Sequence, residues 1–213
     1  EDTELCAAFD SAEDIHVYTA GRIYGIEPEQ VTKDMRRAAK TVNYAVLYGI
    51  SDFALGRQLK IPQAEAKALK ENYFSRFPAV KEYLDDTIAF AREKGYVQTI
   101  LGRKRWIPDI HARIFQFRQA AERAASNMPI QGSSEDIMKL AMIDVWKFLQ
   151  TEKPQTRLLL QVHDELLFEA PLDEVAQVGA RVQELMEKTY PLRVTLDVDV
   201  KTGETWADVT PVG

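Results

Sequence analysis

Several features common in other classes of protein are scarce in this sequence. It has a single cysteine, Cys6, so no disulfide can form within the chain. No apolar run approaches the ~18 residues that a membrane-spanning helix needs. The first ten residues lack the basic segment and apolar core of a secretory signal. We therefore expect no membrane association and a cytoplasmic location, where an unpaired cysteine is common.

Histidine is also scarce, with only three residues in the chain. His16 and His111 have no metal-ligand spacing to His163, which argues against a histidine-based metal centre. Internal repeats and low-complexity tracts are also missing from the sequence. With 213 residues, 46% of them hydrophobic, the chain is long enough for one large domain or two small ones.

Positive charge is in deficit, and the net charge of −6 argues weakly against a nucleic-acid partner. The charge is unevenly distributed, however. Residues 92–123 contain eight Lys/Arg and three Asp/Glu, a local net charge of +5 that leaves −11 for the remainder. Partner choice follows local potential more than total charge. This stretch therefore either contacts a polyanion or is a solvated basic loop.

Periodicity and turn residues predict an α+β fold, helix-rich, with a small antiparallel sheet near the C-terminus. Pro129, followed by the apparent capping box Ser133–Asp136, predicts that one helix ends and another begins there. The first expected element is a helix to about Tyr24 with Asp14 as its cap. Further helices are expected over 28–48, from 62, over 78–95, over 114–126, to about 150 and over 175–186. Hairpins are expected over 96–108 and 158–168, and a half-buried strand over 192–200.

One face of the helix expected at residues 34–48 carries a stripe of cations and aromatics. Relative to Arg36, Lys40 lies at about 40°, Tyr44 at about 80° and Tyr48 at about 120° around the helix axis. The apolar residues occupy the other side. Arginine and lysine suit the phosphates of a nucleoside triphosphate, and a tyrosine ring suits its sugar and base. The alternative is a surface helix with a solvated basic side.

A pair of carboxylates lies at the expected turn between two apolar strands, in the string His163-Asp164-Glu165. Phosphoryl transfer with two Mg²⁺ ions needs hard oxygen ligands on a rigid support, which a hairpin tip provides. Neighbouring residues of a strand point to opposite faces, so one carboxylate can bind metal while the other lies beside it. The alternative is a polar turn without a ligand.

Between these two features, Arg123, Asn127 and Gln131 recur at four-residue spacing. Such side chains can read the minor-groove acceptors that every base pair presents in nearly the same place. Because Pro129 is expected to break the helix, Gln131 need not share the face of the other two. Ordinary polar surface is the alternative, since these residue types are mostly exposed.

Three strings together resemble the DNA polymerase I family (family A DNA polymerases). Residues 36–49, RRAAKTVNYAVLYG, resemble the motif B helix of that family. Residues 161–165, QVHDE, resemble motif C, and residues 121–132 are similar to the block between the two motifs. The resemblance covers essentially the whole chain, from about Asp14 to Trp206.

The resemblance implies template-directed DNA synthesis, as in DNA replication and repair, with primer–template DNA and dNTPs as partners. Residues 1–95 would be fingers helices and 96–213 part of a palm, a right-hand polymerase fold that is incomplete in this chain. The implied site residues are Arg36, Lys40, Tyr44 and Tyr48 for dNTP, Arg123, Asn127, Gln131 and His163 for DNA, and Asp164 and Glu165 for catalysis with two Mg²⁺ ions, Asp164 being a direct metal ligand. In a bacterium such a protein is expected to be cytoplasmic and nucleoid-associated.

The family's motif A, whose aspartate shares both metal ions with motif C, has no convincing counterpart in this chain. Asp197 and Asp199 alternate with apolar residues and are expected to face solvent. We therefore expect this chain to be one piece of a larger polymerase, inactive without an upstream segment that carries motif A. The alternative functions are a non-catalytic DNA-binding fragment and a metal-dependent nuclease built on His163, Asp164 and Glu165.

Two positions depart from the commonest version of motif B. Many members have phenylalanine where this chain has Tyr44, and glycine where it has Ala45. Alanine stiffens the helix relative to glycine. The hydroxyl of Tyr44 would lie near the 3′ position of the incoming sugar. We therefore expect ready acceptance of dideoxynucleotides.

Overall fold

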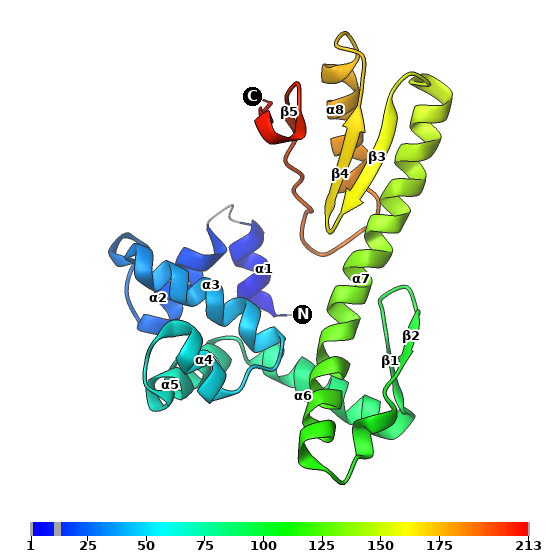
Figure 1. Cartoon of the computed structure of the whole chain (residues 1–213). Coiled ribbons are helices and arrows are strands. Elements are labelled where there is room, and N and C mark those ends of the chain that lie inside the picture. The colour runs from blue at the N-terminus through cyan, green and yellow to red at the C-terminus, as the bar shows by residue number, and fades with distance from the viewer. Residues whose placement is uncertain (1, 11–13, 213) are drawn as a thin grey trace. The chain divides into compact units, whose positions relative to one another are not determined.

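The computed structural model describes residues 2–10 and 14–212, which form a helix-rich α+β structure with three two-stranded antiparallel sheets (Figure 1). The helices are α1 (Thr3–Asp10), α2 (Ile15–Tyr24), α3 (Lys33–Leu47), α4 (Asp52–Leu59), α5 (Gln63–Arg76), α6 (Pro78–Lys94), α7 (Phe115–Glu152) and α8 (Val175–Glu187), with 3-10 turns η1 (Pro28–Gln30), η2 (Pro108–His111) and η3 (Trp206–Asp208). The strands are β1 (Tyr96–Gln98), β2 (Lys104–Trp106), β3 (Arg157–Val162), β4 (Glu165–Glu169), β5 (Lys201–Thr202) and β6 (Thr210–Pro211).

The chain divides into two compact units, Glu1–Ser133 and Ser134–Gly213. The boundary between them lies inside α7, so each unit contains part of that helix. The division after residue 95 expected from the sequence separates fingers from palm by function, and it remains a prediction. No helix in the described parts of either unit has the length and apolar character needed to cross a membrane.

The first unit has its main core where α2, α3, α4 and α5 meet. Val42 of α3, Leu55 of α4 and Tyr73 of α5 are each at most 2% exposed. Each such side chain contributes roughly 1.5–3 kcal/mol by leaving water. The ring centroid of Tyr73 also lies 4.9 Å from that of Phe77. This core fixes the apolar side of α3 and leaves Lys40, Tyr44 and Tyr48 on the opposite side exposed.

A second cluster in the same unit joins α6, the β1–β2 hairpin and the first half of α7. The hairpin expected over 96–108 is present, with Tyr96 opposite Trp106. Two hydrogen bonds attach its turn to α7: the backbone N–H of Ile100 donates to Ser133 Oγ at 2.9 Å, and Arg103 Nη2 donates to the carbonyl of Gly132 at 3.0 Å.

The second unit is built around the last turns of α7 and the amphipathic helix α8. Val145 and Phe148 of α7 are buried against Val178 and Val182 of α8. The β3–β4 hairpin adds partly buried side chains to this core, among them Phe168. The hairpin is therefore anchored at its base, while its turn stands clear of the core.

The expectation that Pro129 ends a helix was wrong, because α7 continues through it from Phe115 to Glu152. The string Ser133–Asp136 consequently caps nothing: Ser133 Oγ donates to the carbonyl of Pro129, and Asp136 is 8% exposed in mid-helix. A proline inside a helix costs about 3 kcal/mol. Side chains buried on both sides of it, such as Met128 and Met138, offset that cost.

The expected strand over residues 192–200 is also absent from the described structure. The alternation itself is present, since Val194 and Val198 are partly buried and Asp197 and Asp199 are exposed. The backbone of Val198 bonds to side chains of α8 instead of a neighbouring strand: its carbonyl accepts from Gln183 at 2.9 Å, and its N–H donates to Glu187 at 3.3 Å. Without a partner strand the segment is extended but forms no ladder.

Near the N-terminus, two smaller differences concern helix boundaries. The helix expected over 28–48 is two elements, η1 and α3, because Thr32 caps α3 by accepting from the N–H of Met35 at 3.2 Å. Helix α4 was not predicted. It begins at the similar cap Ser51, which accepts from Ala54 N at 3.2 Å.

Candidate functional site

Helix α3 has the two-sided character that its sequence predicted. Ala39, Val42 and Val46 are buried in the core of the first unit. On the opposite side Lys40 is exposed, and Tyr44 and Tyr48 are 52% and 38% exposed. Large aromatic side chains in such exposed positions are available for a ligand.

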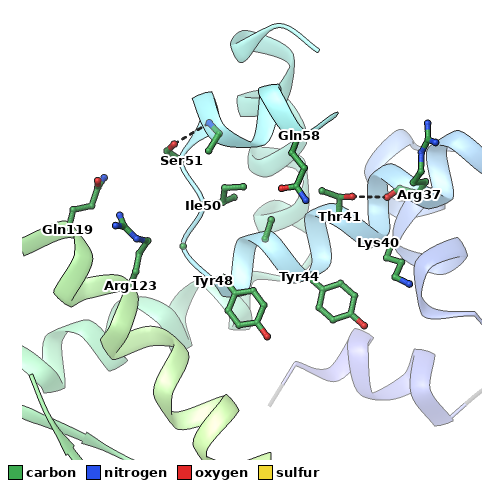
Figure 2. A pocket seen from close by; sticks show the side chains of 13 residues that line it. Arg37, Lys40, Thr41, Tyr44, Tyr48, Ile50, Ser51, Gln58, Gln119 and Arg123 are labelled. Atoms are coloured by element: carbon green, nitrogen blue, oxygen red, sulfur yellow. Dashed lines mark hydrogen bonds between the residues drawn. The ribbon is translucent and has the colours of Figure 1, made fainter. Parts of the chain in front are cut away.

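A pocket of about 630 Å³ opens beside these side chains (Figure 2). Three elements of the first unit provide its wall: α3, the following segment into α4, and α7. The lining residues are Arg37, Lys40, Thr41, Tyr44, Ala45, Tyr48, Gly49, Ile50, Ser51, Ala54, Gln58, Gln119 and Arg123. The volume falls in the range of small-molecule sites, and the lining mixes apolar surface with cations.

Gly49 closes α3 and brings the chain close to α7. Its φ of +64° lies in the left-handed region that favours glycine. A Cβ at this position would lie 3.1 Å from Cγ of Arg123. The close approach therefore requires a residue without a side chain, and it holds Arg123 at the edge of the pocket.

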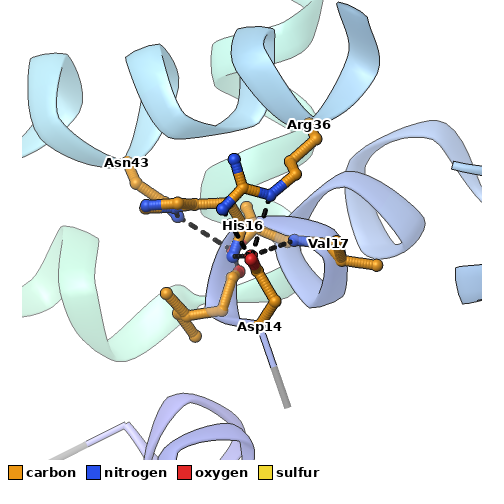
Figure 3. Close-up of polar contacts among 7 residues, drawn as sticks. Asp14, His16, Val17, Arg36 and Asn43 are labelled. Atoms are coloured by element: carbon orange, nitrogen blue, oxygen red, sulfur yellow. Dashed lines mark hydrogen bonds and ion pairs between the residues drawn. The ribbon is translucent and has the colours of Figure 1, made fainter. Parts of the chain in front are cut away.

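Arg36 does not line this pocket but pairs with Asp14, the residue that caps α2 (Figure 3). Its Nε and Nη2 donate to Asp14 Oδ2 at 2.9 and 2.5 Å. The arginine hydrogen bond is the main reason that the pKa of Asp14 lies below its ordinary value. The stripe expected from the sequence is thus divided, with Lys40, Tyr44 and Tyr48 at the pocket and Arg36 on the flank facing α2.

His16 was given no role by the sequence analysis, yet it belongs to this flank. Asn43 of α3 places its amide nitrogen 3.2 Å from Nδ1 of His16 and donates to Thr19 Oγ1 at 3.1 Å. The ring centroid of His16 is 6.0 Å from that of Tyr44. Burial lowers the pKa of His16, and Arg36 and Lys40 lower it further against the opposite effect of Asp14. The lowered pKa favours the neutral imidazole, whose Nδ1 can accept the amide hydrogen of Asn43.

One feature could have drawn attention to His16. It follows the expected cap Asp14 by two residues, so it lies in the first turn of α2. However, its partner Asn43 lies 27 residues further along the chain. Sequence spacing cannot reveal a contact between two helices at that separation.

The continuity of α7 changes the expectation for its polar residues. In an unbroken helix Arg123, Asn127 and Gln131 lie within about 80° of one another, so Gln131 shares the face of the other two. Gln131 is exposed, while Asn127 is partly buried. The side-chain oxygen of Asn127 is buried and accepts no hydrogen bond within the described residues. This face therefore offers a polar row that begins at the pocket.

The second unit carries the two carboxylates at the expected hairpin. Val162 pairs with Glu165, which leaves His163 and Asp164 as a two-residue turn. His163 adopts φ +56°, and its carbonyl accepts from Gln161 Nε2 at 3.0 Å. Asp164 and Glu165 are exposed.

A metal ion would find a partial ligand set at this turn. The oxygens of Asp164 and Glu165 are the hard donors that Mg²⁺ prefers. Within residues 2–10 and 14–212, however, no three His, Cys, Asp or Glu side chains come together as a metal-binding group. The two carboxylates fit a Mg²⁺ site that is completed by further ligands.

Cations and aromatic side chains line the pocket of the first unit, and two exposed carboxylates lie at the hairpin turn of the second. Comparison with known sequences shows the family: the model of DNA polymerase family A matches residues 1–208, and the chain belongs to this family.

Curated relatives and a solved structure are similar over nearly the whole chain. DNA polymerase I of Geobacillus stearothermophilus is 50% identical over 208 residues, and the thermostable DNA polymerase I of Thermus thermophilus is 48% identical over 205. These matches cover 98% and 96% of this chain but only 24% of each relative. The polymerase domain of Pol1 from M. smegmatis, in complex with DNA primer–template and dNTP, matches with a TM-score of 0.87 and 44% identity, over 92% of this chain and 35% of that one.

Proposed function

We propose that this chain carries the nucleotide-binding helix, a duplex-contacting helix and one metal-binding hairpin of a template-directed DNA polymerase. The observation that carries the proposal is the pocket beside α3, where Lys40, Tyr44 and Tyr48 meet Arg123. Membership of DNA polymerase family A and the DNA primer–template and dNTP bound in the M. smegmatis structure support it.

In this proposal α3 receives the incoming dNTP. Lys40 and Arg36 bind the triphosphate through charge-assisted hydrogen bonds. Tyr44 packs against the sugar and base, and Tyr48 lies at the end of the site where the template base arrives. The buried wall of α3 holds these groups in place, which reduces the entropy lost when the substrate binds.

The polar face of α7 and the hairpin turn act on the primer–template. Arg123, Asn127 and Gln131 contact minor-groove acceptors, and His163 contacts the primer terminus. Asp164 would hold Mg²⁺ together with a carboxylate from an upstream segment, and Glu165 would be an auxiliary carboxylate beside it. Two bound Mg²⁺ ions supply the activation of the primer 3′-hydroxyl and the charge stabilisation at the transferred phosphate.

Primer extension tests this proposal. The chain is assayed with primer–template, four dNTPs and Mg²⁺, alone and together with the upstream polymerase segment. Extension only in the presence of both pieces supports a shared active site. Asp164→Asn in the combined assay should reduce the rate by several orders of magnitude, because a metal ligand is lost. Extension by the chain alone would contradict the need for an upstream carboxylate.

The incomplete ligand set also favours a second candidate for the chain by itself, a non-catalytic DNA-binding fragment. Two exposed carboxylates without a third ligand in the described residues would not hold two ions. This candidate predicts duplex binding with no extension even when the upstream segment is added.

A further inference from the structure

We propose that Asp14 is a positioning residue for Arg36, which it holds so that one edge of the guanidinium faces the triphosphate of the incoming nucleotide. This inference rests on the proposed function, because it assumes that Arg36 contacts the phosphates. Without this role, the negative charge of Asp14 would only oppose the binding of an anionic substrate.

The two oxygens of Asp14 have separate partners (Figure 3). Oδ1 accepts from the backbone N–H groups of His16 and Val17 at 2.9 and 3.0 Å and so caps α2. Oδ2 accepts from Nε and Nη2 of Arg36. The carboxylate is therefore fixed to the end of one helix by its first oxygen while it holds a side chain of the next helix by the second.

The bond pattern leaves part of the guanidinium available. Of the five N–H groups of an arginine, Asp14 engages one on Nε and one on Nη2. Within the part of the chain that the structure describes, Nη1 of Arg36 makes no hydrogen bond. The free edge can donate two parallel hydrogen bonds to a phosphate, the geometry in which arginine binds oxyanions best.

Stability of the fold does not account for this ion pair. The side chains of Arg36 and Asp14 are 43% and 40% exposed. Ion pairs at such exposure contribute little to folding. Orientation is the larger effect, because a free arginine has many rotamers and an arginine held on one edge has few.

The direction in which one substitution changes nucleotide affinity distinguishes positioning by Asp14 from a simple electrostatic effect. Asp14→Asn removes the charge but keeps the capping oxygen, since asparagine caps helices as well as aspartate. Electrostatics alone predicts tighter binding of a polyanion once a nearby negative charge is gone. Positioning predicts the reverse: binding of inorganic tripolyphosphate and of dATP weakens, roughly threefold to tenfold, because Arg36 must be ordered at the moment of binding.

Titration calorimetry on the full-length protein that carries this chain makes the test, with Asp14→Asn, Arg36→Ala and the double variant. If Asp14 acts through Arg36, Asp14→Asn weakens binding in the native background and has no effect beside Arg36→Ala. Asp85→Asn, which removes a carboxylate paired with Lys81 on α6, is the charge-matched control and should leave affinity unchanged. Circular dichroism checks that every variant keeps its helices.

Different results would overturn the positioning role of Asp14 and the nucleotide site. Equal or tighter binding by Asp14→Asn, while Arg36→Ala still weakens binding, overturns the positioning role and leaves the proposed function intact. Unchanged binding by Arg36→Ala, or no binding by the native protein, overturns the nucleotide site and the positioning role with it.

Discussion

At the scale of single residues, the hydroxyl of Tyr44 is the feature most open to a direct test. The ring is 52% exposed on the pocket side of α3 and lies near His16. If the sugar of a nucleotide packs there, the hydroxyl can replace the hydrogen-bond partner that a dideoxynucleotide lacks.

We expect Tyr44→Phe, in the complete polymerase, to increase discrimination against dideoxynucleotides roughly tenfold to a hundredfold, the value of one hydrogen bond in a desolvated site. Competitive incorporation of ddNTP and dNTP measures the ratio. Tyr48→Phe is the matched control and should change the ratio little. Unchanged selectivity in Tyr44→Phe would remove the hydroxyl from the sugar site.

The backbone at His163 gives a second prediction. A residue with a side chain at φ +56° carries a cost of about 1 kcal/mol that glycine does not. His163→Gly should therefore raise the free energy of unfolding of the second unit by about 0.5–1 kcal/mol, measured by urea denaturation. His111→Gly, at a position without positive φ, should destabilise the protein because it loses the 2.8 Å bond to the Arg92 carbonyl. Destabilisation by both variants would show that the turn is not strained.

At the scale of secondary-structure elements, α7 depends on a glycine in its interior. A Cβ on Gly132 would lie 2.8 Å from Cγ2 of Thr99 and 3.2 Å from Cε of Met128. Gly132→Ala gains about 1 kcal/mol in helix propensity but overpacks a buried contact, at a cost of about 1–3 kcal/mol.

We expect Gly132→Ala to lower the free energy of unfolding by about 1 kcal/mol, read from thermal or urea denaturation. Gly179→Ala on α8 is the matched control. Its Cβ would meet only Cγ1 of Val200 at 3.2 Å, at the end of the extended 192–200 segment. That variant should be neutral or stabilising, and a loss in both would point to a general intolerance of alanine.

The elements that the sequence predicted well are those decided by local chemistry. Helix α3 shows its two sides in the spacing of Lys40, Tyr44 and the buried valines, and the β3–β4 turn shows itself in the charged residues between apolar runs. Both need only periodicity and turn chemistry.

The elements predicted wrongly are those decided by distant contacts. Pro129 is a local signal to end a helix, but side chains buried on either side of it keep α7 intact. The 192–200 segment has the alternation of a strand, but a strand also needs a partner for its backbone. The Asp14–Arg36 and His16–Asn43 contacts span 22 and 27 residues and have no local signature.

At the scale of the whole molecule, the stability of the first unit should decrease at alkaline pH because of a tyrosine in its core. Burial raises the pKa of Tyr73 to about 12. A group whose pKa is higher in the folded state than in the unfolded state stabilises the fold below the unfolded pKa, about 10 for tyrosine. That contribution is lost as the pH rises from about 10 to about 12.

Tyr73→Phe should therefore flatten the decline of stability between pH 10 and pH 12, by roughly 2–3 kcal/mol at the upper end. Denaturation at fixed pH values across this range measures the slope. Tyr18→Phe provides a comparison at a tyrosine that is only partly buried against the same core. An unchanged slope in Tyr73→Phe would show that the pKa of this hydroxyl is the same in the folded and the unfolded states.

The pairing of Arg36 with Asp14 also has a consequence for the ionic environment of the site. An arginine open to solvent attracts mobile anions, which a binding polyanion must displace, and this displacement makes affinity fall steeply with salt. Arg36 has a fixed counter-ion that is part of the protein and cannot be released. Nucleotide binding should therefore depend on salt less steeply than the number of cations around α3 suggests, and the site should keep its affinity in a crowded, salt-rich cell.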